Sequence, residues 1–195
     1  MLLVKSYDTV VNRQPEVLKG LAAGTIGGLV ASWVMEEFQY AWVKVSRSMQ
    51  QLQQNGSDDP SAANHAEQSQ SGDEEQEPAT VKAAEMVSEK IFGHQLAKDE
   101  KVMAGDAVHY AIGAASAAIY SMTAELVPEV TVGAGLPFGA AVWLVVDEAA
   151  VPLLGLSKGP TEYPPSTHIY GLASHFVYGL TTEVVRRALR RTILS

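Results

Sequence analysis

Four long apolar segments alternate with polar segments along the chain. The apolar segments are rich in Ala, Gly, Val and Leu and contain few charged residues. They cover residues 18–40, 105–127, 130–154 and 168–187. A helix of about 20 residues matches a bilayer hydrocarbon core of about 30 Å. The pattern therefore predicts an all-α polytopic membrane protein with four transmembrane helices.

The polar segments predict less regular structure. Residues 46–79 are rich in Gln, Ser, Asp and Glu, and they have too little apolar surface to offset the entropy of ordering, which predicts a disordered insertion. Residues 80–103 return to a helical period and predict a short amphipathic helical segment at the membrane surface or against the bundle. A soluble helical bundle remains an alternative, because Ala- and Gly-rich helices are only moderately hydrophobic.

Basic residues predict the orientation. A block of four arginines closes the last apolar segment: Arg186, Arg187, Arg190 and Arg191. Arginines flanking a span stay in the cytoplasm, so the C-terminus is expected there. Four spans then return the N-terminus to the same side.

Composition excludes several classes of protein. The net charge of −8 comes largely from the acidic insertion, which argues against a nucleic-acid partner. The chain has no cysteine, which excludes disulfides and thiolate metal sites. No P-loop, Ser-His-Asp order or zincin motif is present. The apolar segments make the lipid bilayer the expected partner.

Small residues predict close helix packing. The first segment carries Gly20, Gly24 and Gly28 at intervals of four, and the third carries Gly135 and Gly139. Such spacing lets helix backbones approach closely in lipid. The same faces could serve an assembly or scaffold subunit that binds a second copy or a membrane-complex partner.

The second and fourth segments share a pattern that predicts an internal repeat. Counted from Gly113 and from Gly171, Ala, Ser, Tyr, Thr and Glu recur at identical offsets. The first and third segments each place a carboxylate twelve residues after a glycine, counted from Gly24 and from Gly135. The chain is therefore expected to contain two related helical hairpins.

Titratable residues gather at one predicted depth, toward the outer ends of the spans. They are Glu36, Glu37, His109, Asp147, Glu148, His168 and His175. Ionisable groups in lipid normally face the bundle interior and pair with one another. The set could be a structural polar lock, a proton-responsive element, a small-ligand site, or a site for a divalent transition metal in a redox enzyme or transporter. The sequence establishes no cofactor, and the absence of a Glu-x-x-His pair disfavours a di-iron site.

A second charged group is expected at the opposite end of the spans. Glu183 lies four residues before Arg187, the helical spacing of an ion pair.

Three motifs carry a family resemblance. They are the second segment ending in Thr-Ala-Glu at 123–125, the Val-Pro-Leu-Leu-Gly-Leu run at 151–156, and the His-Phe-Val-Tyr-Gly…Thr-Glu-Val-Val-Arg-Arg close at 175–187. The chain thereby resembles the YagU-like family of bacterial inner-membrane proteins. The resemblance implies a multi-pass protein of the bacterial inner membrane without an assigned activity. The acidic insertion departs from the shorter pattern of that family.

Overall fold

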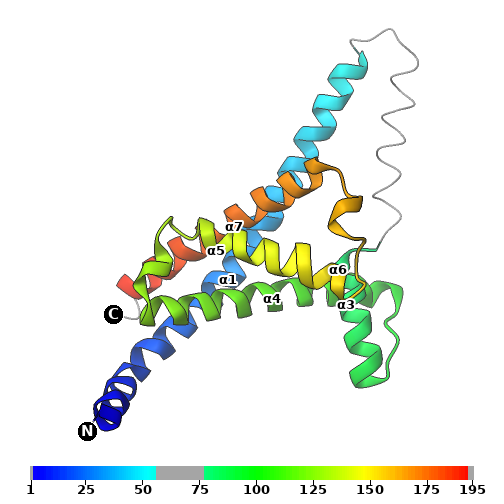
Figure 1. The fold of residues 1–195 in the computed structure, drawn as a ribbon. Helices are drawn as coiled ribbons and strands as arrows, with labels where there is room; N and C mark the ends of the chain where they lie inside the picture. The colour runs from blue at the N-terminus through cyan, green and yellow to red at the C-terminus, as the bar shows by residue number, and fades with distance from the viewer. Residues whose placement is uncertain (1, 56–76, 193–195) are drawn as a thin grey trace. The chain divides into compact units, whose positions relative to one another are not determined.

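The computed structural model describes residues 2–55 and 77–192, and all regular structure in these ranges is helical (Figure 1). The long helices are α1 (Leu2–Asn55), α4 (Lys98–Leu126) and α7 (Pro165–Thr192). The shorter elements are α3 (Ala79–Val87), the π-helical η1 (Ser88–Phe92), the 3₁₀ turn η2 (Pro128–Thr131), α5 (Leu136–Val142), the π-helical η3 (Trp143–Ala150), α6 (Val151–Leu153) and the 3₁₀ turn η4 (Pro160–Glu162). The predicted all-α class is therefore confirmed for the described residues.

The chain forms two compact units. The first comprises Met1–Met35 with His109–Ser195, and the second comprises Glu36–Val108. The helices α1 and α4 each contribute to both units.

In the first unit, glycines bring α1 against α4. A Cβ placed on Gly28 would lie 2.6 Å from the carbonyl oxygen of Gly113 and 2.7 Å from the Cβ of Ala117. A Cβ on Gly20, two turns earlier in α1, would lie 2.6 Å from the side chain of Glu125. Residues later in α1 thus contact residues earlier in α4. The two helices are therefore antiparallel, and their backbones lie very close together.

A second close contact joins α5 to α7. The carbonyl of His175 fills the space that a Cβ on Gly139 would need. The carbonyl of Gly179 fills the space that a Cβ on Gly135 would need. The order of these contacts again makes the two helices antiparallel. The glycines predicted to pack helices therefore all lie at helix contacts.

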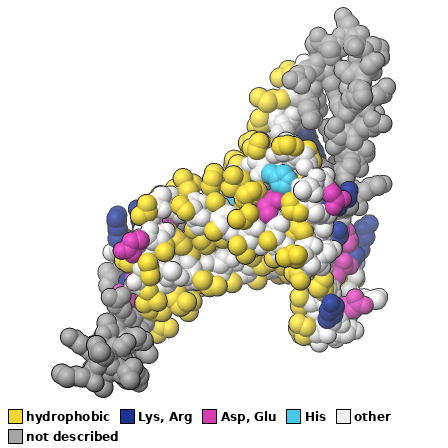
Figure 2. Space-filling view, in the orientation of Figure 1, with side chains coloured by type: hydrophobic (Ala, Val, Ile, Leu, Met, Phe, Trp, Pro, Cys, Tyr) yellow, Lys and Arg dark blue, Asp and Glu magenta, His cyan; other side chains and the backbone are white. Residues whose placement is uncertain are grey.

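The interior of the first unit is small and polar. Its largest fully buried side chains are Glu183, Thr182, Ser32, Ser121 and Ser174. Large apolar side chains point outward, among them Trp33 at 55% exposed, Ile119 at 61% and Ile169 at 63%. Hydrophobic side chains accordingly cover much of the described surface that Figure 2 shows. In a water-soluble domain the large apolar residues are the ones buried, so this distribution supports a membrane protein.

Three described helices are long and apolar enough to cross a membrane: Pro15–Met49, Lys98–Leu126 and Leu136–Leu153. The helix α7, predicted to hold the fourth span, is not among them. Polar residues repeat every four positions on its buried side, as Ser174, Tyr178, Thr182 and Arg186 do. The low apolar content of α7 therefore comes from the face that packs inside the protein.

The third predicted span begins later than the sequence pattern suggested. Gly133, Ala134 and Gly135 all have positive φ angles, which interrupt any helix between η2 and α5. Pro137 lies in the first turn of α5, where proline is tolerated because its missing N–H would have no helical partner.

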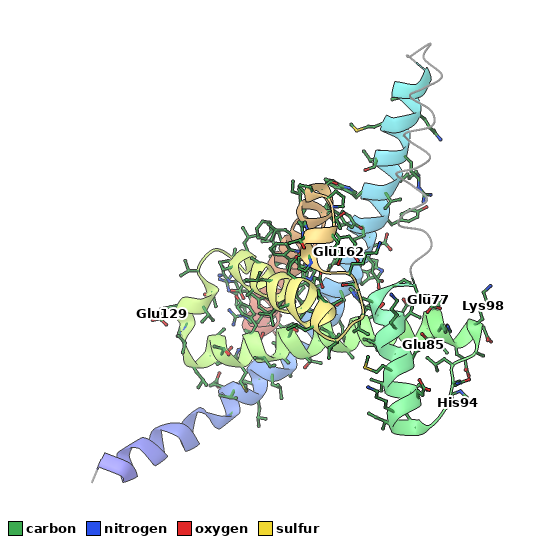
Figure 3. All side chains as sticks on the ribbon, turned by 45° about the vertical axis from the view of Figure 1, so that its right-hand side comes forward. Glu77, Glu85, His94, Lys98, Glu129 and Glu162 are labelled. Carbon is green, nitrogen blue, oxygen red and sulfur yellow. The ribbon has the colours of Figure 1, made fainter. Side chains whose placement is uncertain are left out.

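The second unit contains the polar N-terminal part of α4 packed on α3. Lys101 lies 2.8 Å from a carboxylate oxygen of Glu77 and 2.5 Å from one of Glu85. Figure 3 labels both glutamates. The hydrogen bond from Lys101 holds the pKa of the Glu77 carboxyl below its ordinary value. Gly93, with a φ of 63°, ends the η1 turn in the left-handed conformation.

The helix α1 continues to Asn55, ten residues into the segment 46–79 that was predicted to be disordered. Residues 46–55 include Gln, Met, Arg and Leu, which are good helix formers, and extending an existing helix is far easier than starting one. Residues 56–76 lie outside the described part of the chain.

Substitution of Gly28 should test the contact between α1 and α4. Gly28→Leu forces a side chain into the space held by Gly113 and Ala117, and overpacking of this kind costs about 1–3 kcal/mol. Ala22→Leu is the matched control, because Ala22 faces outward on the same helix. Thermal unfolding in detergent should show a clear loss of stability for Gly28→Leu alone. Equal stability of the two variants would contradict the contact.

Candidate functional site

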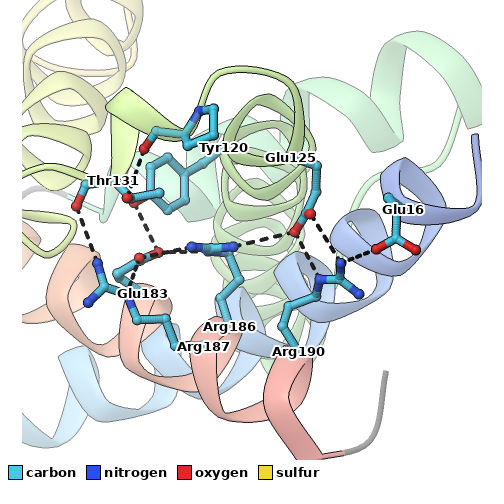
Figure 4. Close-up of polar contacts among 9 residues, drawn as sticks. Glu16, Tyr120, Glu125, Thr131, Glu183, Arg186, Arg187 and Arg190 are labelled. Carbon is cyan, nitrogen blue, oxygen red and sulfur yellow. Dashed lines mark hydrogen bonds and ion pairs between the residues drawn. The ribbon is translucent and has the colours of Figure 1, made fainter. Parts of the chain in front are cut away.

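A cluster of carboxylates and arginines joins α1, α4 and α7 at one end of the first unit (Figure 4). Glu183 is its centre and is 1% exposed. Its carboxylate accepts hydrogen bonds from Arg186 Nε at 2.7 Å, Arg186 Nη2 at 2.9 Å and Arg187 Nε at 2.5 Å. The hydroxyl of Tyr120, on α4, donates a further hydrogen bond at 3.0 Å. The carboxylate is thus held from two helices.

Glu125 extends the cluster to the next arginine of α7. Arg190 donates to Glu125 through Nε at 2.9 Å and Nη2 at 3.1 Å, and Arg186 Nη1 reaches the same carboxylate at 3.4 Å. Arg190 also donates to Glu16 on α1. One guanidinium group therefore links α1 to α4, and the N-terminal part of α1 lies beside the C-terminal part of α7.

Opposite charges face one another throughout the cluster. Three carboxylates, of Glu16, Glu125 and Glu183, face the guanidinium groups of Arg186, Arg187 and Arg190. A buried charge is tolerated only when it is paired and hydrogen-bonded, and removing one partner is strongly destabilising. The pair of Glu183 with Arg187 was expected from its spacing. The contacts to Tyr120, Glu125 and Glu16 were not, because they depend on how three helices align.

Histidines and carboxylates lie toward the opposite end of the first unit. His168, near the start of α7, places Nδ1 2.6 Å from Glu148 Oε1 and Nε2 2.9 Å from the carbonyl oxygen of Pro160. Both neighbours are acceptors, so both ring nitrogens donate only when the imidazole is protonated. The geometry is that of an ion pair between η3 and α7 beside the loop that joins α6 to α7.

Two turns further along α7, His175 lies beside Asp147. His175 is 7% exposed, its Nδ1 lies 2.9 Å from the carbonyl oxygen of Gly171, and Asp147 Oδ2 lies 3.6 Å from the same nitrogen. The carbonyl oxygen makes Nδ1 the hydrogen-bond donor, so Nε2 is the nitrogen without a proton in the neutral ring. Asp147 also interacts electrostatically with His109 of α4. Titratable groups from three helices therefore meet here.

A π-helical segment sets the position of Asp147. The element η3 runs for eight residues, Trp143–Ala150, and carries both Asp147 and Glu148. The wider π-helical turn changes the direction of side chains relative to an α-helix, and such segments often occur at functional sites. The two neighbouring carboxylates can thereby serve different histidines, Asp147 with His175 and Glu148 with His168.

The seven titratable residues of the predicted set are divided between the two units. His109, Asp147, Glu148, His168 and His175 belong to the first unit, whereas Glu36 and Glu37 belong to the second. Within the part of the chain that the structure describes, no three His, Asp or Glu side chains form a group that could hold a metal ion. The metal-binding alternative therefore gains no support from the geometry.

Aromatic rings lie between the two charged ends. Phe138 of α5 stacks on Tyr120 at a centroid distance of 4.3 Å and meets Tyr178 at 5.7 Å. The hydroxyl of Tyr178 donates to the carbonyl oxygen of Gly113 at 2.6 Å, where the glycine allows close approach. This aromatic stack, Tyr120–Phe138–Tyr178, fills the interior between the histidines and the arginine cluster.

Comparison with known proteins finds a similarity to one family and no activity. The model of a family described as "Protein of unknown function (DUF1440)" matches residues 94–184. The matched region includes α4, α5, η3 and α6 and most of α7. No curated protein and no solved structure matches the chain. The YagU-like name is compatible with this match and remains a prediction.

Glu183→Gln should test the arginine cluster. The substitution leaves the guanidinium groups of Arg186 and Arg187 without their shared counter-charge, and breaking a buried ion pair costs about 3–5 kcal/mol. Arg191→Ala removes an exposed charge from the same block and should change stability by less than about 0.5 kcal/mol. Denaturation in detergent measures both variants. A small effect of Glu183→Gln would mean that the cluster does not hold the helices together.

Proposed function

We propose that the chain is an integral membrane protein with four spans, both termini cytoplasmic in the bacterial inner membrane, whose His/carboxylate site responds to protons. The observation that carries the membrane assignment is the inverted burial, with Glu183 and hydroxyl side chains inside and Leu, Ile and Trp outside. Three apolar helices support it. The fourth span is α7, because the helix contacts α4 and α5 along most of its length and turns apolar residues such as Val184 outward.

The arginines support the proposed orientation. Arg190 contacts Glu16, so the basic end of α7 and the start of the apolar part of α1 lie at the same end of the first unit. Lys19 lies there too, paired with Glu16 at 3.3 Å. Basic residues at one end of a bundle favour the cytoplasmic side.

Matching glycine contacts support the proposal of two related hairpins. The sequence repeat aligns Gly24 with Gly135 and Gly113 with Gly171, and therefore Ser121 with Gly179. A Cβ on Gly24 would meet Ser121, and a Cβ on Gly135 would meet Gly179. The contacts of Gly28 with Ala117 and of Gly139 with His175 obey the same alignment. Equivalent residues thus make equivalent contacts in the α1–α4 and α5–α7 pairs.

The proton response rests on His175 and Asp147. A neutral His175 can accept a proton at Nε2, and the Asp147 carboxylate 3.6 Å from the ring stabilises the resulting charge. Histidine is the side chain that most often serves as a proton-responsive group in proteins. A buried charge that appears or disappears between helices alters how those helices pack. The arginine cluster, in contrast, holds the helices of the bundle together.

Cysteine labelling tests the fourth span. The chain has no native cysteine, so Lys158→Cys, in the loop before α7, and Thr192→Cys, at its end, each give a single label site. A membrane-impermeant maleimide applied to intact cells and to inverted vesicles should modify the two cysteines from opposite sides. Labelling of both from the same side would show that α7 does not cross.

The fluorescence of Trp143 tests the proton response. Trp143 packs on Gly171, one turn from His175, and protonated imidazole quenches nearby indole emission. In a Trp33→Phe, Trp42→Phe background, emission should fall as pH drops through the histidine range, to about pH 5.5. His175→Gln should abolish this change. Emission that is independent of pH, or that titrates unchanged in His175→Gln, would refute the proposed response.

A further inference from the structure

The outward face of α7 changes from apolar to basic near the end of the helix. Exposed apolar side chains follow one another along this face at helical spacing: Ile169, Phe176, Leu180 and Val184. The same face then continues with two exposed arginines, Arg187 and Arg191. The outward side of the proposed fourth span therefore ends in two guanidinium groups one helical turn apart.

The length of the apolar face places these arginines near the phosphates of a bilayer. Measured along the helix from Ile169, Arg187 lies at about 27 Å and Arg191 at about 33 Å. The hydrocarbon core of a bilayer is about 30 Å thick. When the apolar face crosses this core, the two arginines reach the headgroup layer of the leaflet at the arginine end.

Arg187 keeps part of its guanidinium group accessible although it belongs to the arginine cluster. Its Nε donates to Glu183, and its Nη2 lies 3.4 Å from the carbonyl oxygen of Thr131, as Figure 4 shows. Arg186 already donates to both oxygens of the Glu183 carboxylate. The side chain of Arg187 remains 45% exposed, so its charge is available to a further anion.

Arg191 has even fewer ties to the protein. It makes no hydrogen bond or ion pair with a described residue. Glu129, an exposed carboxylate in the η2 turn, forms no ion pair with Arg187 or Arg191 within the described ranges. The two guanidinium groups can therefore bind one anion without breaking a contact inside the bundle.

The surface beside Arg187 is apolar. Thr131, which contacts Arg187, is followed by Val132, whose side chain is 73% exposed. Leu136, at the start of α5, is also exposed, and the neighbouring Gly135 packs against Gly179 of α7. A pair of arginines that adjoins an apolar surface matches an anion that carries acyl chains better than it matches a soluble anion.

We infer that Arg187 and Arg191 bind the headgroup phosphate of an anionic phospholipid, whose acyl chains lie against Val184, Val132 and Leu136. Guanidinium groups donate paired hydrogen bonds to phosphate oxygens, and basic residues at a membrane surface attract anionic lipids. A zwitterionic headgroup binds less well, because its ammonium group opposes the arginines. This inference rests on the proposed crossing of α7.

Lipid binding to the purified chain in detergent tests the inference. Three probes are added separately: phosphatidylglycerol, phosphatidylcholine with the same acyl chains, and glycerophosphoglycerol, which is the first headgroup without acyl chains. Native mass spectrometry measures the bound probe, and thermal unfolding measures the stabilisation. Phosphatidylglycerol should remain bound and raise Tm, and the other two should do so much less.

Two results with these probes would overturn the inference. Equal effects of phosphatidylglycerol and phosphatidylcholine would show that the headgroup charge is not recognised. An equal effect of glycerophosphoglycerol would show a site for a soluble anion, and the assignment to a lipid would be wrong.

Arg191→Gln removes one phosphate ligand without touching the arginine cluster. Each basic residue near an anionic membrane surface contributes about fivefold in affinity, so phosphatidylglycerol should bind about fivefold more weakly. Adding Arg187→Gln should bring the loss above about tenfold. The matched control is Lys44→Gln with Lys90→Gln, which removes two exposed charges elsewhere. Unchanged affinity in the double arginine variant, or an equal loss in the control, would overturn the site.

The labelling of Lys158→Cys and Thr192→Cys separates this inference from the proposed fourth span. Labelling from opposite sides, together with unselective lipid binding, overturns the lipid site and leaves the span in place. Labelling of both cysteines from the same side overturns both.

Discussion

The constraint on which the structure depends is that polar side chains have to find their partners inside the protein. The outward surfaces of the helices are apolar, so lipid offers nothing to Glu183, Tyr178 or Thr182. Such groups are stable only where neighbouring helices come close enough to satisfy them. Glycines provide that approach: Gly113 exposes its carbonyl to Tyr178, and Gly135 and Gly139 bring α5 against the polar face of α7. The close packing at the glycines is therefore also what lets the buried polar groups form their hydrogen bonds.

The two ends of the bundle use the same residue types for different purposes. At the arginine end each buried carboxylate faces permanently charged guanidinium groups, so Glu183 and Arg186 remain an ion pair at any physiological pH. At the histidine end the cation is an imidazole, whose charge depends on pH. In the proposed function, the arginine cluster holds the fold at one end, and the pair of His175 with Asp147 responds to protons at the other.

The sequence predicted the helical class, the glycine contacts and the i,i+4 pair of Glu183 with Arg187, because each depends on spacing within one helix or on a repeated small residue. It did not predict the link from Arg190 to Glu16 or that from Tyr120 to Glu183, since these depend on the alignment of separate helices. Local composition also carried no sign of the π-helical segment that aims Asp147 and Glu148 at different histidines. The low hydropathy of α7 is explained by the polar residues of its buried face, which the structure identifies.

The accessibility of spin labels tests the central claim, that lipid surrounds the outward faces of four helices. Single cysteines at Trp33, Ile119, Leu144 and Val184, one on each helix, provide outward label sites in a chain without native cysteine. In bilayers, labels at all four positions should collide with oxygen and be shielded from a water-soluble nickel reagent. Strong collision of the Val184 label with the nickel reagent would show α7 in water, and the same result at all four sites would contradict the account.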